Sequence, residues 1–274
     1  MIIGIDIGGS TTKIVGFEDT HLIAPLAVSA SDPVTSASGA MGKFIDSNSI
    51  KLSQIDHVRV TGVGASFIKP SLLGFEIEKV EEFRAVGFGG LYLSGLLKAI
   101  VVSMGTGTAY VKAHGKCVDH IGGTGIGGGT LTGLAKSMLN TGDFNSIIDL
   151  AKDGNAKNVD LTVGDISKRD IENLPSNITA SNFGKIADNA SKNDVAAGII
   201  NMVFQTIGML AIFAAKAQKD KDIIMTGNLV RVPQSKKTFD ELAKLFDVKF
   251  HFPKHAQFAT AIGAAISKKI DKFL

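Results

Sequence analysis

Residues 2–17 read IIGIDIGGSTTKIVGF, and this stretch decides the fold of the chain. A β-branched run ends at Asp6, the turn GGSTT occupies residues 8–12, and a second β-branched run follows from Lys13. Two such runs around a glycine-rich turn predict a β-hairpin.

Residues 99–113, AIVVSMGTGTAYVKA, repeat this order of strand, glycine turn and strand. The repeat predicts two similar domains, residues 1–95 and 96–274, with a boundary near residues 94–98 that one sequence places only to within about four residues. Helices are expected at 35–46, 82–98, 130–140, 143–153, 193–218, 235–246 and 258–272, and further strands at 56–61 and 222–226. Residues 153–182 are polar and contain glycine and proline, which predicts irregular surface structure near a site.

The composition is that of a soluble α/β protein. The chain has 274 residues, of which 45% are hydrophobic and 20% charged, so disordered and fibrous classes are excluded. The formal charge is +3 and the basic residues are scattered, so no nucleic-acid partner is expected. One cysteine, Cys117, allows no intrachain disulfide. The first residues lack the basic region of a signal peptide. The cytoplasm is therefore the expected compartment.

Residues 196–215 form the only stretch that is a candidate membrane span. Asn201, Gln205 and Thr206 interrupt its centre, where burial in lipid would be costly. The stretch is therefore predicted to be a core or interface helix, and no membrane partner is expected.

The glycine turns suit an anionic phosphate, because flanking Ser and Thr and absent side chains leave backbone N–H groups accessible. A single turn of this kind is usually only a turn. Two turns, each at the head of its own half, predict that both domains grip one nucleotide triphosphate. Asp6 could orient a metal ion or its waters, and Lys13 could reach phosphate oxygens as a point charge.

Residues 122–133, GGTGIGGGTLTG, contain a G-x-G-x-x-G pattern. Dinucleotide binding would require a clear strand before the pattern and an acidic residue about 20 positions beyond it. Residues 117–121 are too short and polar for a buried parallel strand, so this interpretation is not favoured. No G-x-x-x-x-G-K-[ST] sequence occurs either.

The chain resembles the type II pantothenate kinases. The blocks that carry the resemblance follow the family's order: GIDIGGSTTK (4–13), VEEFRAVGFGGLYL (80–93), SMGTGTAY (103–110), GGTGIGGGT (122–130), DGNAKNVDLTVGDI (153–166), TASNFGK (179–185), GNLVRV (227–232) and TAIGAAI (260–266). The resemblance spans almost the whole chain. It implies an α/β fold of duplicated ribonuclease-H-like, actin-like ATPase domains with a nucleotide cleft between them. It also implies ATP-dependent phosphorylation of pantothenate to 4′-phosphopantothenate, the first step of coenzyme A biosynthesis, with Mg²⁺, in a homodimer that packs through the helix near 193–218.

The resemblance also assigns roles to residues. Glu82 would accept the proton of the acceptor hydroxyl; spacing alone favours an acid that caps or decorates a helix, and only the resemblance favours the catalytic role. Asp6 would position Mg²⁺. The remaining residues expected to bind the nucleotide or its phosphates are Gly8, Gly9, Ser10, Thr11, Lys13, Gly105, Thr106, Gly107, Thr108, Gly125, Gly127, Gly128, Gly129, Gly227 and Asn228. Those expected to bind the acceptor are His120, Ala109 and Phe252.

The acceptor residues depart from the family pattern. His120 stands where the family has an arginine that binds the substrate carboxylate, and Ala109 stands where it has a serine. Histidine cannot form the forked contact of a guanidinium. A neutral acceptor such as pantetheine is therefore an alternative substrate.

Three other functions share the expected fold. An actin- or chaperone-like ATPase is disfavoured by the kinase-like block at 80–93. A reductive ATPase that holds an iron-sulfur cluster needs two cysteines from each subunit, and this chain has only Cys117. A sugar kinase of the same superfamily would commonly use an aspartate base.

Overall fold

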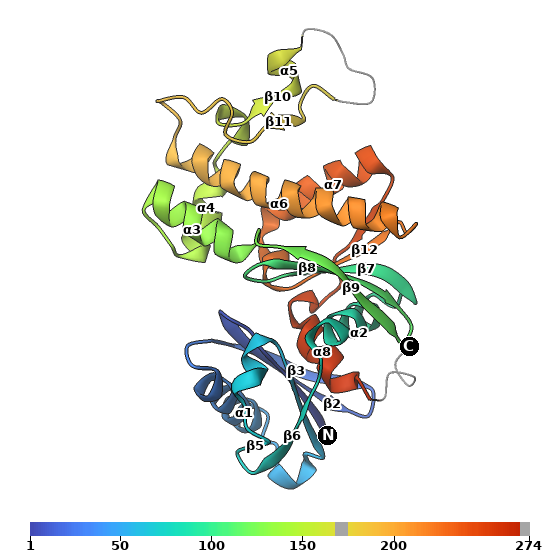
Figure 1. Cartoon of the computed structure of the whole chain (residues 1–274). Helices are drawn as coiled ribbons and strands as arrows, with labels where there is room; N and C mark the ends of the chain where they lie inside the picture. Colours follow the sequence, from blue (N-terminus) through green and yellow to red (C-terminus); the bar gives the residue numbers. More distant parts are fainter. Residues whose placement is uncertain (168–174, 269–274) are drawn as a thin grey trace.

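The computed structural model describes residues 1–167 and 175–268, which form two mixed β-sheets with helices between and around them (Figure 1). In Figure 1 the first sheet lies below the helices α2 (Glu82–Ser94) and α8 (Ala259–Ile266), and the second sheet lies above them. The two sheets thus enclose a layer of two crossing helices.

The first sheet has the strand order β3-β2-β1-β4-β6-β5. Its strands are β1 (Ile2–Ile7), β2 (Thr11–Glu18), β3 (His21–Ser29), β4 (His57–Thr61), β5 (Ser71–Leu72) and β6 (Phe75–Lys79). The predicted hairpin of residues 2–17 is confirmed: β1 and β2 pair antiparallel, and the register places Asp6 opposite Lys13. All six residues of β1 are buried, because α1 (Pro33–Ser47) and α8 both pack against this strand.

The second sheet, of order β13-β12-β7-β8-β9, repeats the topology of the first. Its strands are β7 (Lys98–Met104), β8 (Thr108–His114), β9 (Cys117–Thr124), β12 (Asp222–Thr226) and β13 (Lys249–His251). In both sheets an antiparallel meander of three strands is extended by parallel strands beside its first strand. The repeat predicted from the two hairpins is therefore confirmed.

The second sheet carries most of the helices. They are α3 (Gly128–Leu139), α4 (Phe144–Lys152), α6 (Lys192–Ala217) and α7 (Pro233–Phe246). A small arm extends beyond α6 and contains β10 (Leu161–Thr162), α5 (Val163–Ile166) and β11 (Thr179–Ser181) (Figure 1). This arm lies in the segment predicted to be irregular, and its described elements are all short.

Helix α6 is long and apolar enough to cross a membrane by length and composition alone. In the most apolar 18-residue window of α6, 56% of the residues are buried inside the protein. Its buried face packs on β7, β8 and β12 and on the neighbouring helices. This packing is that of a core helix, as the sequence predicted.

Helices α2 and α8 cross at unusually short range because glycines lie at the contact. A Cβ atom on Gly89 would lie 1.8 Å from the carbonyl oxygen of Ala259, and one on Gly263 would lie 1.8 Å from that of Ala85. Helix α2 contacts the second sheet and α8 contacts the first, so each helix links the two halves. The division at residues 95 and 96 stays a prediction.

Candidate active site

A cavity of about 530 Å³ lies between the two sheets, at the turns of both hairpins. Both turns are closed by their own backbone: Gly8 N–H donates to Thr11 O at 3.1 Å, and Gly105 N–H donates to Gly107 O at 2.9 Å. The predicted site residues that line this cavity are Asp6, Gly8, Gly9, Ser10, Thr11, Lys13, Glu82, Gly105, Thr106, Gly107, Thr108, Ala109, His120, Gly227 and Asn228. Residues far apart in the sequence thus share one cleft.

The two halves are joined across this cleft by a hydrogen bond. Asn228 Nδ2 donates to Thr11 Oγ1 at 2.9 Å. Gly227 has a φ of 89° and packs on the backbone of Met104, where a Cβ atom would meet the carbonyl oxygen at 2.4 Å. The glycine therefore brings the end of β12 against the second hairpin, and Asn228 can reach the first.

Asp6 and Lys13 form a buried pair at the base of the cavity. Lys13 Nζ lies 3.6 Å from Asp6 Oδ2, and each residue is 7% exposed. Burial raises the pKa of Asp6, and the charge of Lys13 and its hydrogen bond oppose that rise. A carboxylate and an ammonium group are therefore fixed next to the turns, where phosphate and a metal ion would bind.

Glu82 faces the cavity, and its neighbour Glu81 caps the helix. The Glu81 carboxylate accepts the backbone N–H groups of Phe83 at 3.0 Å and Arg84 at 2.8 Å. The alternative that Glu82 caps α2 is therefore wrong. Burial raises the pKa of Glu82, and the charges of Asp6 and Glu81 raise it further. A half-buried carboxylate with a raised pKa is suited to accept a proton.

An aromatic stack borders the cavity beside Glu82. The rings of Phe83 and His120 are parallel within 7°, with centroids 3.8 Å apart. His120 lies on β9, which pairs with β8, where Ala109 also lines the cavity. His120 is an exposed residue. This side of the cavity therefore presents a flat ring and a small residue.

A second cavity, of about 440 Å³, adjoins the first along the glycine turns. Gly9, Ser10, Thr11, Gly105, Thr106 and Asn228 line both cavities. The N-terminus of α3 brings Gly128 and Gly129 to the second one. The second cavity extends from the glycine turns toward a less polar wall. A nucleoside would fit against such a wall.

Three predicted site residues line neither cavity. Gly127 packs against the second hairpin, where a Cβ atom would lie 2.5 Å from Thr106 O, and Gly125 lies at the same bend. Phe252 packs 5.6 Å from the ring of Phe239 in the core of the second half.

Sequence reasoning missed residues that line the cavities at isolated positions. In the first cavity they are Val63, Phe83, Ser103, Gly123, Thr124 and Thr260, and in the second Thr132, Phe144, Leu229 and Arg231. Most of them lie inside the blocks 80–93, 103–110, 122–130, 227–232 and 260–266, which could have pointed to them; Val63, Thr132 and Phe144 lie outside these blocks. Phe144 had no local signal, because only the packing of α4 brings it to the cleft.

The residues of the cleft fit a magnesium ion held partly by phosphate. Within residues 1–167 and 175–268, no group of three or more His, Cys, Asp or Glu side chains could hold a metal ion by itself. Mg²⁺ usually takes one or two carboxylates together with substrate phosphates and waters. Asp6 supplies one carboxylate beside the turns. Across the β1–β4 register from Asp6, the buried Thr61 Oγ1 has no hydrogen-bond partner.

Comparison with known proteins places the chain among pantothenate kinases. The family model described as Fumble matches residues 95–267. A type II pantothenate kinase of Bacillus cereus (strain G9842) is 31% identical over 239 residues, which cover 82% of this chain and 83% of that protein. A type II pantothenate kinase of Oceanobacillus iheyensis is 30% identical over 274 residues, which cover 97% of this chain and 98% of that protein.

The fold also matches solved structures. One is the activator of the 2-hydroxyisocaproyl-CoA dehydratase from Clostridium difficile, solved with bound ADPNP. It superposes with a TM-score of 0.67 at 14% sequence identity, and the superposition covers 99% of this chain and 96% of that chain. At this identity the likeness shows the fold alone. It confirms the predicted actin-like, duplicated α/β architecture.

Proposed function

The chain belongs to the type II pantothenate kinase family, and from this premise we propose that it transfers the γ-phosphoryl group of ATP to pantothenate, giving 4′-phosphopantothenate. This reaction is the first step of coenzyme A biosynthesis. The observation that carries the proposal is the position of Glu82, whose carboxylate faces a cavity shared with both glycine turns while Glu81 alone caps the helix.

The reaction needs a base for the acceptor hydroxyl and positive groups for the transferred phosphoryl group. Glu82 accepts the proton of the attacking hydroxyl, and its raised pKa brings it closer to the working pH than an ordinary glutamate. Lys13 contacts the phosphate from the base of the cavity. The turns at residues 8–12 and 105–108 hold the phosphates through backbone N–H groups and Ser and Thr hydroxyls.

Asp6 would hold Mg²⁺ together with the nucleotide phosphates. The ion supplies charge neutralisation for the β- and γ-phosphates when it is bound. Burial raises the pKa of Asp6 and Lys13 opposes that rise, so Lys13 favours the charged carboxylate that a cation requires. The second cavity, with Phe144 and Gly128 in its wall, would take the adenosine.

The acceptor side of the cleft keeps a second substrate open. His120 stacks on Phe83 and occupies the place of a carboxylate-binding arginine in the family. A neutral imidazole offers no permanent charge for the pantothenate carboxylate. Pantetheine, which keeps the two hydroxyls and carries a thiol-ended amide in place of the carboxylate, is therefore the second candidate acceptor.

The exposed surface of α6 supports a homodimer, and the single cysteine, Cys117, supports a cytoplasmic location. Leu210 and Phe213 are 36% and 56% exposed on α6, so large apolar side chains of this helix face outward. An apolar stripe of this kind is covered in an obligate dimer. We infer a homodimer that packs through α6, in the cytoplasm. Sedimentation at micromolar concentration should give twice the mass of 28.7 kDa, and a monomer alone would contradict the dimer.

The function is tested by measuring ADP release with a panel of acceptors. Wild type is incubated with Mg·ATP and pantothenate, pantetheine, glucose or no acceptor. We expect release that depends on pantothenate or pantetheine and is near background with glucose and without acceptor. Equal release in all four mixtures would indicate an ATPase, and release only with glucose would indicate a sugar kinase.

A further inference from the structure

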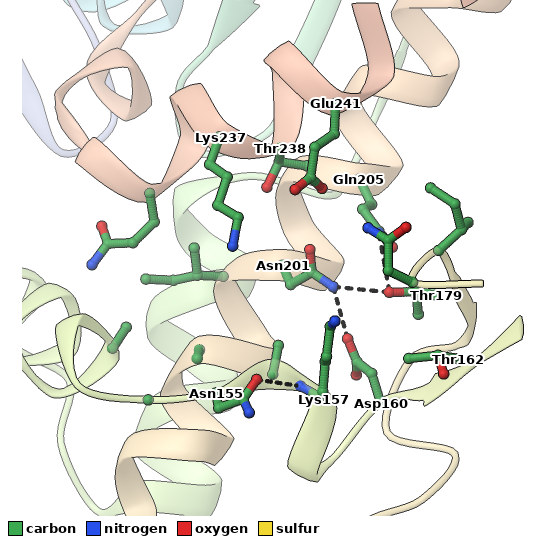
Figure 2. A pocket seen from close by; sticks show the side chains of 18 residues that line it. Asn155, Lys157, Asp160, Thr162, Thr179, Asn201, Gln205, Lys237, Thr238 and Glu241 are labelled. Carbon is green, nitrogen blue, oxygen red and sulfur yellow. Dashed lines mark hydrogen bonds between the residues drawn. The ribbon is translucent and has the colours of Figure 1, made fainter. Parts of the chain in front are cut away.

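A third cavity, of about 230 Å³, lies away from the nucleotide cleft, between α6, α7, the 3₁₀ helix η3 (Ala156–Asn158) and β11 (Figure 2). None of the residues that line it lines either cavity of the active site. The proposed kinase reaction gives it no role.

The floor of this cavity is a fixed polar network. Asp160 is 1% exposed, and its carboxylate accepts Phe183 N–H at 2.8 Å and Asn201 Nδ2 at 2.7 Å. Thr179 Oγ1 accepts Asn201 Nδ2 at 3.2 Å and Gln205 Nε2 at 3.1 Å. These bonds hold the amide groups of α6 in one orientation beneath the cavity. The polar floor is thus preorganised for a polar ligand.

Two lysines enter the cavity from opposite walls. Figure 2 shows Lys157 rising from η3 toward Asn201 and Lys237 descending from α7 into the same cavity. Neither ammonium group has an ion pair or hydrogen bond with any residue that the structure describes, and the one side-chain contact drawn for Lys157 in Figure 2 is that of its backbone N–H with Asn155 Oδ1. Two cations that converge on one space favour an anionic ligand between them.

Other groups limit what that anion can be. Glu241 extends from α7 beside Lys237, so a ligand must also offer a hydrogen-bond donor (Figure 2). Gln234 Nε2 donates to Ile148 O at 3.0 Å, while its buried Oε1 has no partner among the described residues. An unpartnered buried acceptor is costly unless a donor reaches it. A ligand hydroxyl can donate to the exposed Glu241, and it reaches the buried Gln234 Oε1 only if the amide turns toward the cavity.

We propose that this cavity is an effector site for a small hydroxylated anion, a hydroxycarboxylate or a phosphate monoester of a polyol. The anionic group lies between Lys157 and Lys237, and its hydroxyls donate to Glu241 or Gln234. The volume is below the range of about 300 to 1,000 Å³ typical of drug-sized ligands, which restricts the ligand to a small metabolite.

The walls of this site connect directly to the nucleotide cavity. Helix α7 begins at Pro233, two residues after Arg231, which lines the nucleotide cavity. Helix α4 begins at Phe144 in the same cavity, and its residue Ile148 is bound by Gln234. A ligand that fixes Gln234 and Lys237 therefore fixes α7 against α4. Occupancy of one site changes affinity at the other, and the coupling is reciprocal.

The test measures binding without catalysis. L-malate represents the hydroxycarboxylates, glycerol 3-phosphate represents the phosphate esters, and glycerol controls for hydroxyls without charge. Each is titrated into full-length wild type and Lys157→Met/Lys237→Met by calorimetry. Lys236→Met is the matched control, because Lys236 lies next to Lys237 on α7 and pairs with Asp240 at 2.8 Å on the outer side. Melting temperatures verify that the variants are folded.

We expect malate or glycerol 3-phosphate to bind wild type and Lys236→Met at millimolar concentration or better, and glycerol to show no binding. The double variant should bind the anion about tenfold more weakly, a modest factor because both lysines are partly solvated. With the anion bound, the Kd of wild type for ADP should change at least twofold. The site is overturned if neither anion binds or if the double variant binds it equally. An unchanged Kd for ADP would overturn the effector role.

Discussion

The substitution Glu82→Gln separates catalysis from helix capping, because adjacent glutamates hold the two roles. Glutamine keeps the size of the side chain but cannot accept a proton. General-base catalysis contributes roughly 10²- to 10⁴-fold, so we expect kcat to fall by a factor of that order with ATP affinity little changed. Turnover with pantothenate is followed by ADP release.

The stability of the same variant gives an independent check. Folding raises the pKa of Glu82, so the folded state binds its proton more tightly than the unfolded state. The ionised form therefore costs stability as the pH rises through the folded pKa, and the cost is present at pH 7. Glutamine removes this cost, so urea unfolding should show Glu82→Gln equal to or slightly more stable than wild type.

Glu81→Ala is the matched control. It removes the carboxylate that accepts the N–H groups of Phe83 and Arg84, so it should cost about 0.5 to 2 kcal/mol of stability. Its kcat should stay within a few-fold of wild type. Turnover of Glu82→Gln within about threefold of wild type, or a larger loss in Glu81→Ala, would refute the assignment of the base.

The remaining predictions concern the ion site, the helix crossing, the acceptor and the pH profile. Asp6→Asn should abolish most Mg²⁺-dependent turnover, and Lys13→Ala should reduce this turnover less. If both variants show the Mg²⁺ dependence of wild type, Asp6 does not hold the ion and Lys13 does not contact the phosphate. Gly89→Ala should lower the free energy of unfolding in urea by about 1 to 3 kcal/mol, because the new Cβ atom would overlap the α8 backbone. Unfolding at the same urea concentration as wild type would show that the two helices can shift apart freely. Wild type should use pantetheine at least as well as pantothenate, and His120→Arg should raise kcat/KM for pantothenate roughly tenfold or more; a strong pantothenate preference with no gain from arginine would exclude the altered pocket. As the pH falls, kcat/KM should begin to drop at a pH above the pKa of an ordinary glutamate, because Glu82 is inactive once protonated. A drop at the ordinary pKa would show that the pKa of Glu82 is not raised.

The local sequence pattern was enough to predict the hairpins and the helix that position the candidate active site. The two hairpins were readable because β-branched runs and glycine turns are signals that span a few residues. Helix α6 was readable from its apolar length. The end of α2 was expected at residue 98 but lies at Ser94, because Gly95 adopts a φ of 70° and ends the helix. One glycine among apolar residues gave no reason to place the end there.

The parts of the site that depend on distant contacts could not be predicted in this way. Phe144 reaches the second cavity only because α4 packs against α6, with a smaller contact to α3. The sequence does not show which of Glu81 and Glu82 caps the helix, and only the family resemblance favours Glu82 as the base. The hydrogen bonds in the structure identify Glu81 as the cap. The third cavity, between Lys157 and Lys237, joins segments 80 residues apart in the chain, with no motif to mark it.

The central claim is most directly tested by following transfer of the γ-phosphoryl group from ATP to the acceptor itself. Purified protein is incubated with Mg·ATP labelled at the γ-phosphate and with pantothenate or pantetheine, and labelled products are separated and identified by mass. We predict one labelled 4′-phosphorylated product, formed by wild type and by Glu81→Ala but reduced at least about a hundredfold in Glu82→Gln. Label released only as inorganic phosphate, or the same yield of labelled product from Glu82→Gln, would contradict the account.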